Sequence, residues 1–389
     1  MATDQLVVRP EPAAAAPEQP ARSFTNRLPS LTGLRFPAAL AVFAYHAALP
    51  IPSLRLFGDD ATEFRFADLA GQAGGLGVSF FFVLSGFVLT WSARATDTTT
   101  GFWRRRFVKI YPNYVVAWVL AMVLFASAYT PMRTAILNLL MLQVWIPDFN
   151  TNFSVDPPSW SLGAEAIFYL AFPLLHRVFR TIRPQNIKYW LLGTVAGIVA
   201  TPAVAYALLP DSPGVPGGLQ SSVVQYWFTY VLPPVRMMDF ALGMLVAHAV
   251  RSGRWRNIGM VWSSLLLVAG YVATNYVPYL YGQRVVTIVP IVLLIAAAAI
   301  ADNEGRFTLF RNRAMTWLGE VSFAFYLLHF VVLAYLRNLL GTRMFSTAEG
   351  IGLLVGAALA TLALSWALYR LVETPIVRRF SKPRRKLSA

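Results

Sequence analysis

Long apolar runs separated by short polar loops occupy the chain from residue 31 to residue 369. Ten of these runs approach the length of a membrane-spanning helix, which needs about 20 predominantly apolar residues. They are 31–50, 75–91, 111–129, 161–179, 189–209, 223–250, 258–276, 285–301, 315–336 and 350–369. The pattern predicts an all-α polytopic membrane protein with about ten transmembrane helices.

An eleventh apolar run, residues 135–145, is short for a span, and the positions of the basic residues decide how it is interpreted. If it does not cross, the loops on one side hold 26 Lys and Arg and those on the other side hold 6. Basic residues are enriched in cytoplasmic loops. We therefore expect both termini in the cytoplasm and a re-entrant or interfacial segment at 135–145.

Composition agrees with this interpretation, because only 13% of the 389 residues are charged, against about 25% in soluble domains. The net charge of +15 then marks the cytoplasmic side, and we expect no nucleic-acid partner. The absence of cysteine excludes thiolate chemistry. Residues 1–30 are expected to be a disordered tail, residues 31–373 a membrane domain, and residues 374–389 a basic tail.

Two polar residues interrupt the first apolar run. Arg35 and His46 are eleven positions apart, so on an α-helix they lie on one face about 16 Å apart. Glu165, in the fourth span, is expected at the depth of His46. An imidazole beside a carboxylate can act as a general base toward a hydroxyl. The alternatives are a snorkelling arginine, a histidine bonded within the bundle and a carboxylate that only pairs helices.

A basic run enters the third span at the cytoplasmic level of Arg35. Its members Arg105, Arg106 and Lys109 would suit a phosphate-bearing ligand, because guanidinium groups bind phosphate with two parallel hydrogen bonds. The alternative is a topology signal or a contact with anionic lipid.

Three further residues are weaker candidates. Arg236 could contact an oxyanion or the acceptor, or simply pair with Asp239. His329 lies in the outer half of its span, where a bundle histidine is the default. Ser85 has no basic neighbour in the sequence to activate it. No set of histidines with metal-ligand spacing is present, so we expect no metal.

These motifs together resemble the acyltransferase 3 family of bacterial membrane O-acyltransferases. The likeness rests on the pair of Arg35 and His46 and on the sequences GVSFFFVLSGF, FWRRRFVKIYP, WSLGAEAIFY, RMMDFALGM, LGEVSFAFYLLH and VETP, in this order. Lys109 stands where the family usually has arginine, which keeps the charge but loses the planar fork. Ala166 stands where many members carry a second glutamate.

The resemblance implies transfer of an acyl group, acetyl or another short acyl, from acyl-CoA to a hydroxyl of a sugar or macrolide-type glycoside. It places the CoA phosphates near Arg35, Arg105, Arg106 and Lys109, with His46 as base, oriented by Glu165. It also implies a location in the bacterial cytoplasmic membrane. O-acetylation of a cell-surface polysaccharide is a second possibility, and a proton-coupled secondary transporter is an alternative of another class.

Overall fold

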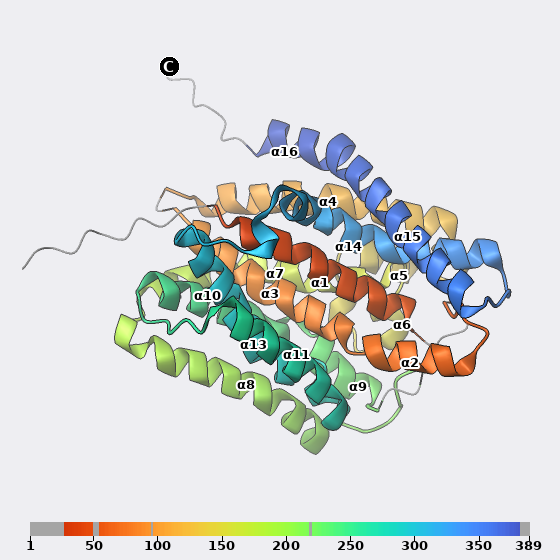
Figure 1. The fold of residues 1–389 in the computed structure, drawn as a ribbon, viewed down its shortest axis with the longest axis horizontal. Coiled ribbons are helices and arrows are strands. Elements are labelled where there is room, and N and C mark those ends of the chain that lie inside the picture. Colours follow the sequence, from red (N-terminus) through yellow and green to blue (C-terminus); the bar gives the residue numbers. More distant parts are fainter. Residues whose placement is uncertain (1–26, 50–53, 95, 218–219, 382–389) are drawn as a thin grey trace, which may run out of the picture.

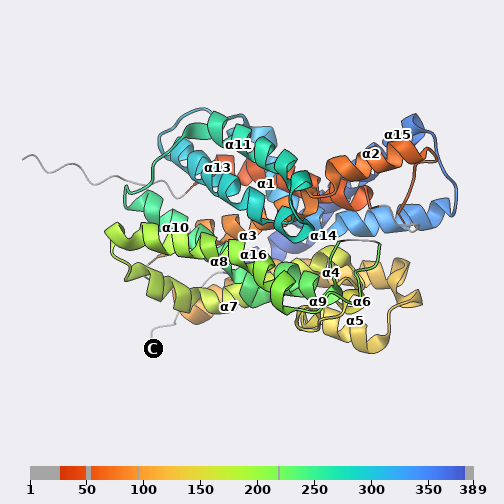
Figure 2. The ribbon, with the colours of Figure 1, turned by 90° about the horizontal axis from the view of Figure 1, so that it is seen from below.

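The protein is an elongated bundle of helices, described here from a computed structural model that covers residues 27–49, 54–94, 96–217 and 220–381 (Figure 1). No β-strand forms within these ranges; their extended segments make two isolated bridges. The long helices run roughly side by side along the long axis of the molecule (Figures 1 and 2). We call the end at which α1 begins the basal end and the end at which α1 stops the distal end.

Helix α1 (Pro29–Ala47) lies at the centre, between α3 (Ala73–Ser92) and α14 (Arg313–Leu340). The next layer is formed by α10 (Pro233–Arg251), which packs along α3. Glycines allow this close approach, because a Cβ on Gly86 or on Gly243 would lie 1.9 Å from a backbone carbonyl oxygen of the facing helix. The two backbones therefore touch where the sequence places small residues.

Longer helices surround this centre. They are α4 (Thr99–Leu124), α7 (Trp160–Arg180), α8 (Ile187–Leu208), α11 (Gly259–Ala273), α13 (Val285–Asn303) and α15 (Thr347–Leu368). Short elements complete the chain: α9 (Val223–Tyr226) with the π-helical turn Trp227–Val231, α12 (Tyr279–Gly282), and α16 (Thr374–Phe380) after the π-helical turn Tyr369–Glu373. Many large apolar side chains on the outer helices face outward, among them Leu192, Val261 and Leu359.

Eight helical stretches among the described residues are long and apolar enough to cross a membrane. This confirms a multi-pass helical protein. The eight include neither α1 nor α11, although both correspond to predicted spans. The count of ten and the orientation of the termini therefore stay predictions.

The chain between α4 and α7 folds back into the bundle. Its longest helix, α5 (Met132–Leu139), has eight residues, or about 12 Å, so the predicted failure of 135–145 to cross as one helix is confirmed. Polar side chains hold the segment together: the Tyr114 hydroxyl donates to Asn138 Oδ1 at 2.8 Å, and the Asn138 amide donates to the Ser154 carbonyl at 3.0 Å. As a result α7 begins inside the bundle.

Helix α2 (Asp60–Ala70) and the early start of α1 were not predicted. Helix α2 follows α1 on the distal side and is capped by the Asp59 side chain, which accepts from two backbone N–H groups. Helix α1 begins at Pro29, inside the range expected to be a tail, and the carboxylate of Asp302 accepts hydrogen bonds from the Ser30 backbone N–H and hydroxyl. The rest of the predicted N-terminal tail, up to residue 26, and residues 382–389 lie outside the described residues.

Candidate active site

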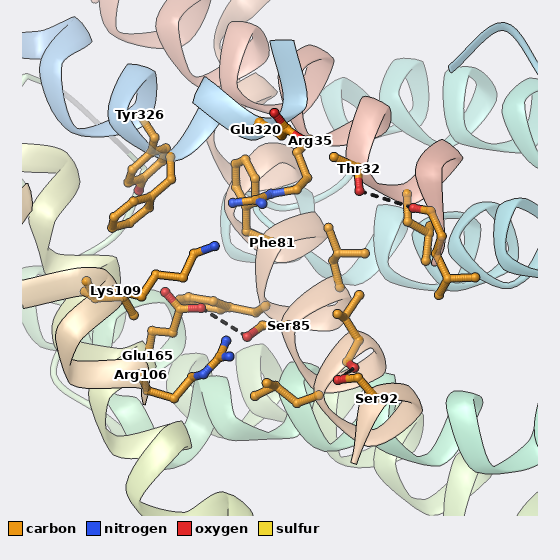
Figure 3. A pocket seen from close by; sticks show the side chains of 18 of the residues that line it. Thr32, Arg35, Phe81, Ser85, Ser92, Arg106, Lys109, Glu165, Glu320 and Tyr326 are labelled. Atoms are coloured by element: carbon orange, nitrogen blue, oxygen red, sulfur yellow. Dashed lines mark hydrogen bonds between the residues drawn. The ribbon is translucent and has the colours of Figure 1, made fainter. Parts of the chain in front are cut away.

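A cavity of about 850 Å³ runs through the basal half of the bundle between α1, α3, α4, α7 and α14. It begins near Pro29 and Ser92 and ends at Ser161 and Tyr326, near the middle of the molecule. Its volume falls in the range of small-molecule sites. Figure 3 shows the charged groups that project into it.

Three predicted cations line this cavity: Arg35 from α1, and Arg106 and Lys109 from α4. Figure 3 shows the Arg35 guanidinium and the Lys109 ammonium pointing toward the same space. Arg106 and Lys109 share a face because residues three apart on a helix are neighbours. Arg105 lies on another face and donates to Asp97 Oδ1 at 2.7 Å, so the expectation that it joins the cluster is wrong.

Glu165 belongs to the cationic part of the cavity. It accepts a hydrogen bond from the Ser85 hydroxyl at 3.1 Å and another from the Tyr169 hydroxyl. Figure 3 shows its carboxylate beside Lys109 and Arg106. Ser85 therefore acts as a hydrogen-bond donor to a carboxylate here.

A second carboxylate, that of Glu373, lies near Lys109. The sequence did not identify it as a site residue. Glu373 Oε1 lies 3.8 Å from Lys109 Nζ, and Glu373 Oε2 accepts from the Asn113 amide at 2.8 Å. Glu373 is buried, at the end of the π-helical turn that joins the apolar helix α15 to the basic helix α16. The only signal in the sequence was an isolated glutamate in the VETP block, which gave no indication of its partner.

The predicted base His46 is hydrogen-bonded to His329. Nε2 of His329 lies 3.0 Å from Nδ1 of His46. Nδ1 of His329 lies 2.7 Å from the Tyr326 carbonyl oxygen, which can only accept, so in a neutral imidazole this nitrogen carries the proton and Nε2 is an acceptor. His46 Nδ1 must then be the donor, shared between His329 and the Val42 carbonyl at 3.0 Å. This leaves the lone pair of His46 Nε2 available to take a proton.

Glu165 does not contact His46, which corrects the expectation that the two share a layer. Because α7 begins inside the bundle, Ser161 meets Tyr326, and their oxygens lie 2.7 Å apart. From this level α14 rises three residues to His329, and α7 descends four residues to Glu165. At 1.5 Å per residue the carboxylate lies about 10 Å basal to the imidazole pair.

Tyr326 and Ser161 separate the cavity from the imidazole pair. The Tyr326 hydroxyl also lies 3.1 Å from the Pro158 carbonyl, so the chain that enters α7 holds it in place. The Tyr326 ring lies 5.8 Å from the His329 ring, and the His329 ring lies 5.0 Å from the His46 ring, between centroids. One layer of side chains therefore stands between the cavity and His46.

Arg236 takes no part in the cavity. Its Nη2 lies 3.1 Å from Asp239 Oδ2 and donates to the Ser79 hydroxyl at 3.0 Å, which is the pairing that the sequence left open. Arg284, from the start of α13, approaches the same carboxylate at 3.6 Å. All three charged side chains are buried, so two cations share one anion.

The described residues contain no group of three or more side chains suited to hold a metal ion. They define a bundle of helices, several of them long and apolar enough to cross a membrane, in which one layer of side chains separates a cationic cavity from an imidazole pair. The family model described as an acyltransferase domain matches residues 28–370, and the chain belongs to this acyltransferase 3 family.

Curated relatives span the same region. The chain is 39% identical to acyltransferase MdmB of Streptomyces mycarofaciens, over 92% of this chain and 94% of that protein. It is 25% identical to peptidoglycan O-acetyltransferase OatA of Listeria monocytogenes and 23% identical to O-acetyltransferase OatA of Staphylococcus aureus, over 90% of this chain in each case. The chain spans little more than half of these two OatA proteins, 56% and 57%. No solved structure matches it.

Proposed function

We propose that this acyltransferase moves a short acyl group, such as acetyl, from acyl-CoA to a hydroxyl of a sugar or macrolide-type glycoside. The observation that carries the proposal is a path, interrupted by one layer of side chains, from a cavity lined by three cations to a histidine with a free lone pair. A donor that is anionic at one end and reactive at the other matches such a path.

The donor phosphates are assigned to Arg35, Arg106 and Lys109. Two carboxylates, Glu165 and Glu320, also line the cavity and partly balance its charge, which limits the affinity for free anions. With both termini in the cytoplasm of a bacterium, the cavity opens toward the compartment in which acyl-CoA is made. The thioester then extends toward Tyr326, and the layer formed with Ser161 must part for the acyl group to reach His46.

The chemistry needs one base. His46 Nε2 removes the proton of the acceptor hydroxyl as the oxygen attacks the thioester carbon. The tetrahedral intermediate collapses with cleavage of the carbon–sulfur bond, and the proton passes from His46 to the leaving thiolate. The products are the O-acyl acceptor and free CoA. His329 holds His46 in the required tautomer and takes the orienting role first expected of Glu165.

The residues of this protein restrict the choice of acceptor less than they restrict the choice of donor. The likeness to MdmB covers nearly the whole of that relative, whereas the OatA relatives, one of which is named for peptidoglycan, match over part of their length. We therefore place a small glycoside first and a cell-surface polysaccharide second. The relatives named as acyltransferases leave no support for the transporter alternative.

The test is release of free thiol from acetyl-CoA by the purified protein in nanodiscs, with and without a glycoside acceptor. His46→Ala should abolish acceptor-dependent release while the protein stays folded. His248→Ala is the matched control, because this half-buried histidine lies 3.4 Å from a backbone carbonyl, that of Ile182, away from the cavity. Full activity of His46→Ala would refute His46 as the base, and absence of acceptor-dependent thiol release by the unaltered protein would overturn the proposed reaction.

A further inference from the structure

Four tyrosines from three separate parts of the chain meet near the distal end. We call Tyr45, Tyr226, Tyr230 and Tyr279 the tyrosine cluster. Ring centroids lie 5.1 Å apart for Tyr226 and Tyr230, and 6.3 Å apart for Tyr226 and Tyr279. Tyr45, from the last turns of α1, is close enough to interact electrostatically with the other three hydroxyls.

The hydroxyls of the tyrosine cluster have no hydrogen-bond partner among the described residues. Tyr226 and Tyr230 are only 3% and 5% exposed, and a buried tyrosine hydroxyl usually finds a partner within the protein. Tyr45 and Tyr279 are half-buried beside them, so the cluster combines two buried hydroxyls with two that are partly accessible. The pattern is that of a site in which a polar ligand completes the hydrogen bonds.

A buried cation, Arg236, contacts one ring of the tyrosine cluster. The Arg236 guanidinium lies between the Tyr230 ring, at 5.2 Å, and the Phe82 ring, at 5.0 Å. Its Nε and Nη1 groups are buried and have no hydrogen-bond partner. A positive charge beneath a phenol ring withdraws electrons from it and makes its hydroxyl a stronger donor. Arg236 thus favours binding of acceptor oxygens by Tyr230.

The cluster adjoins the base through consecutive residues of one helix. The rings of Tyr45 and His46 stand edge to face, with centroids 4.9 Å apart. Gly74 of α3 makes room for the Tyr45 ring, because a Cβ at this position would lie 2.5 Å from it. A ligand on the tyrosine cluster would therefore lie next to the imidazole assigned to deprotonation.

We propose that the tyrosine cluster binds a glycosyl ring of the acceptor. A saturated sugar ring offers an apolar face of C–H groups, which packs on aromatic rings, and hydroxyls at its edge, which pair with phenols. Trp160 extends the aromatic surface, with its ring 4.8 Å from that of Tyr230. The inference rests on the proposed function, since it assigns the acceptor to the distal side of His46 and the donor to the basal cavity.

The test measures binding without catalysis, so that it stays separate from the assignment of His46. The nanodisc protein, without acyl-CoA, is titrated with a macrolide glycoside, its aglycone lacking the sugar, and a tetramer of N-acetylglucosamine. At least one of the two sugar-bearing probes should bind, and the aglycone should bind at least about tenfold more weakly than its glycoside if the glycoside is bound.

The double variant Tyr226→Phe/Tyr230→Phe removes two hydroxyls and keeps both rings. It should raise the Kd of the bound sugar probe about tenfold or more, the effect of losing two neutral hydrogen bonds, and leave acetyl-CoA binding unchanged. Tyr276→Phe is the control, because Tyr276 is 83% exposed in the turn that follows α11. Unchanged sugar binding by the double variant, equal binding of glycoside and aglycone, or no binding of either sugar probe would overturn the proposal. An active His46→Ala protein would instead refute only the proposed base.

Discussion

Replacement of His329 by phenylalanine tests the imidazole pair directly. His329 is fully buried and offers His46 its Nε2 lone pair at 3.0 Å. Phenylalanine fills a similar space between the neighbouring rings of Phe325 and Tyr326 but accepts no hydrogen bond. The His46 Nδ1 proton would then keep only the Val42 carbonyl as a partner, and the ring could turn.

The size of the effect follows from the hydrogen bond that is lost. A buried neutral hydrogen bond contributes about 0.5–1.5 kcal/mol, and a buried donor left partly unsatisfied costs up to about 3 kcal/mol. At about 1.4 kcal/mol per tenfold, kcat should fall by about 2- to 150-fold. Removal of a general base costs about 10²- to 10⁴-fold, so His329→Phe should retain more activity than His46→Ala.

The assay is steady-state thiol release by nanodisc protein, with kcat and the KM for acetyl-CoA determined separately. His329→Phe should lower kcat and leave the donor KM within about twofold, because His329 does not line the cavity. Glu165→Gln should show the reverse, a changed donor KM, because this carboxylate lies among the cations. If His329→Phe kept full kcat, or if Glu165→Gln lowered kcat as His46→Ala does, the assignment of the orienting residue would be refuted.

Three other changes have outcomes set by single contacts. Arg106→Ala should raise the donor KM about tenfold, whereas Arg105→Ala, which loses only an exposed ion pair, should change it less than twofold. Gly86→Ala forces α3 away from the facing backbone, which should destabilise the protein by about 1–3 kcal/mol and lower its melting temperature in detergent. Gly356→Ala, at a site with open space, should leave the melting temperature unchanged. Asp302→Ala leaves buried donors at the start of α1 unpaired and should destabilise the protein by about 1–3 kcal/mol; an unchanged melting temperature would contradict this.

Hydrophobic patterning predicted the fold class and the positions of nearly all the long helices, because lipid-exposed helices need continuous apolar sequence whatever their neighbours are. It also identified residues 135–145 as too short to cross. It missed α2, which has a polar sequence and gains its order from the Asp59 cap. It also placed the start of α7 too near the surface, because burial of polar groups in the returning segment depends on partners such as Asn138 that no local pattern reveals.

The sequence predicted which residues belong to the candidate site better than it predicted which of them contact one another. The sequence placed the basic run of the third span at the level of Arg35, and Arg35, Arg106 and Lys109 do line one cavity. The partner of His46 was missed because depth had been counted from an assumed membrane surface, which placed Glu165 about two turns of helix away from its true level. His329 had been placed in the correct half of its span, but nothing in a single sequence tells which of several histidines at similar depth will meet.

Helix α1 sets the distance over which this enzyme is proposed to act. Arg35 and His46 are parts of one rigid element, about 16 Å apart, so a donor held by its phosphates cannot bring its thioester to the base unless its arm spans that length. The same separation keeps the charges of the basal cavity away from the imidazoles, which lie among the apolar rings of Phe43 and Phe330. A cation placed beside His46 would favour the neutral base but would also attract the donor phosphates to the wrong place. The cations at the basal end therefore serve donor binding, and the imidazole at the distal end serves proton transfer. Shortening α1 between Arg35 and His46 should disrupt both donor binding and proton transfer.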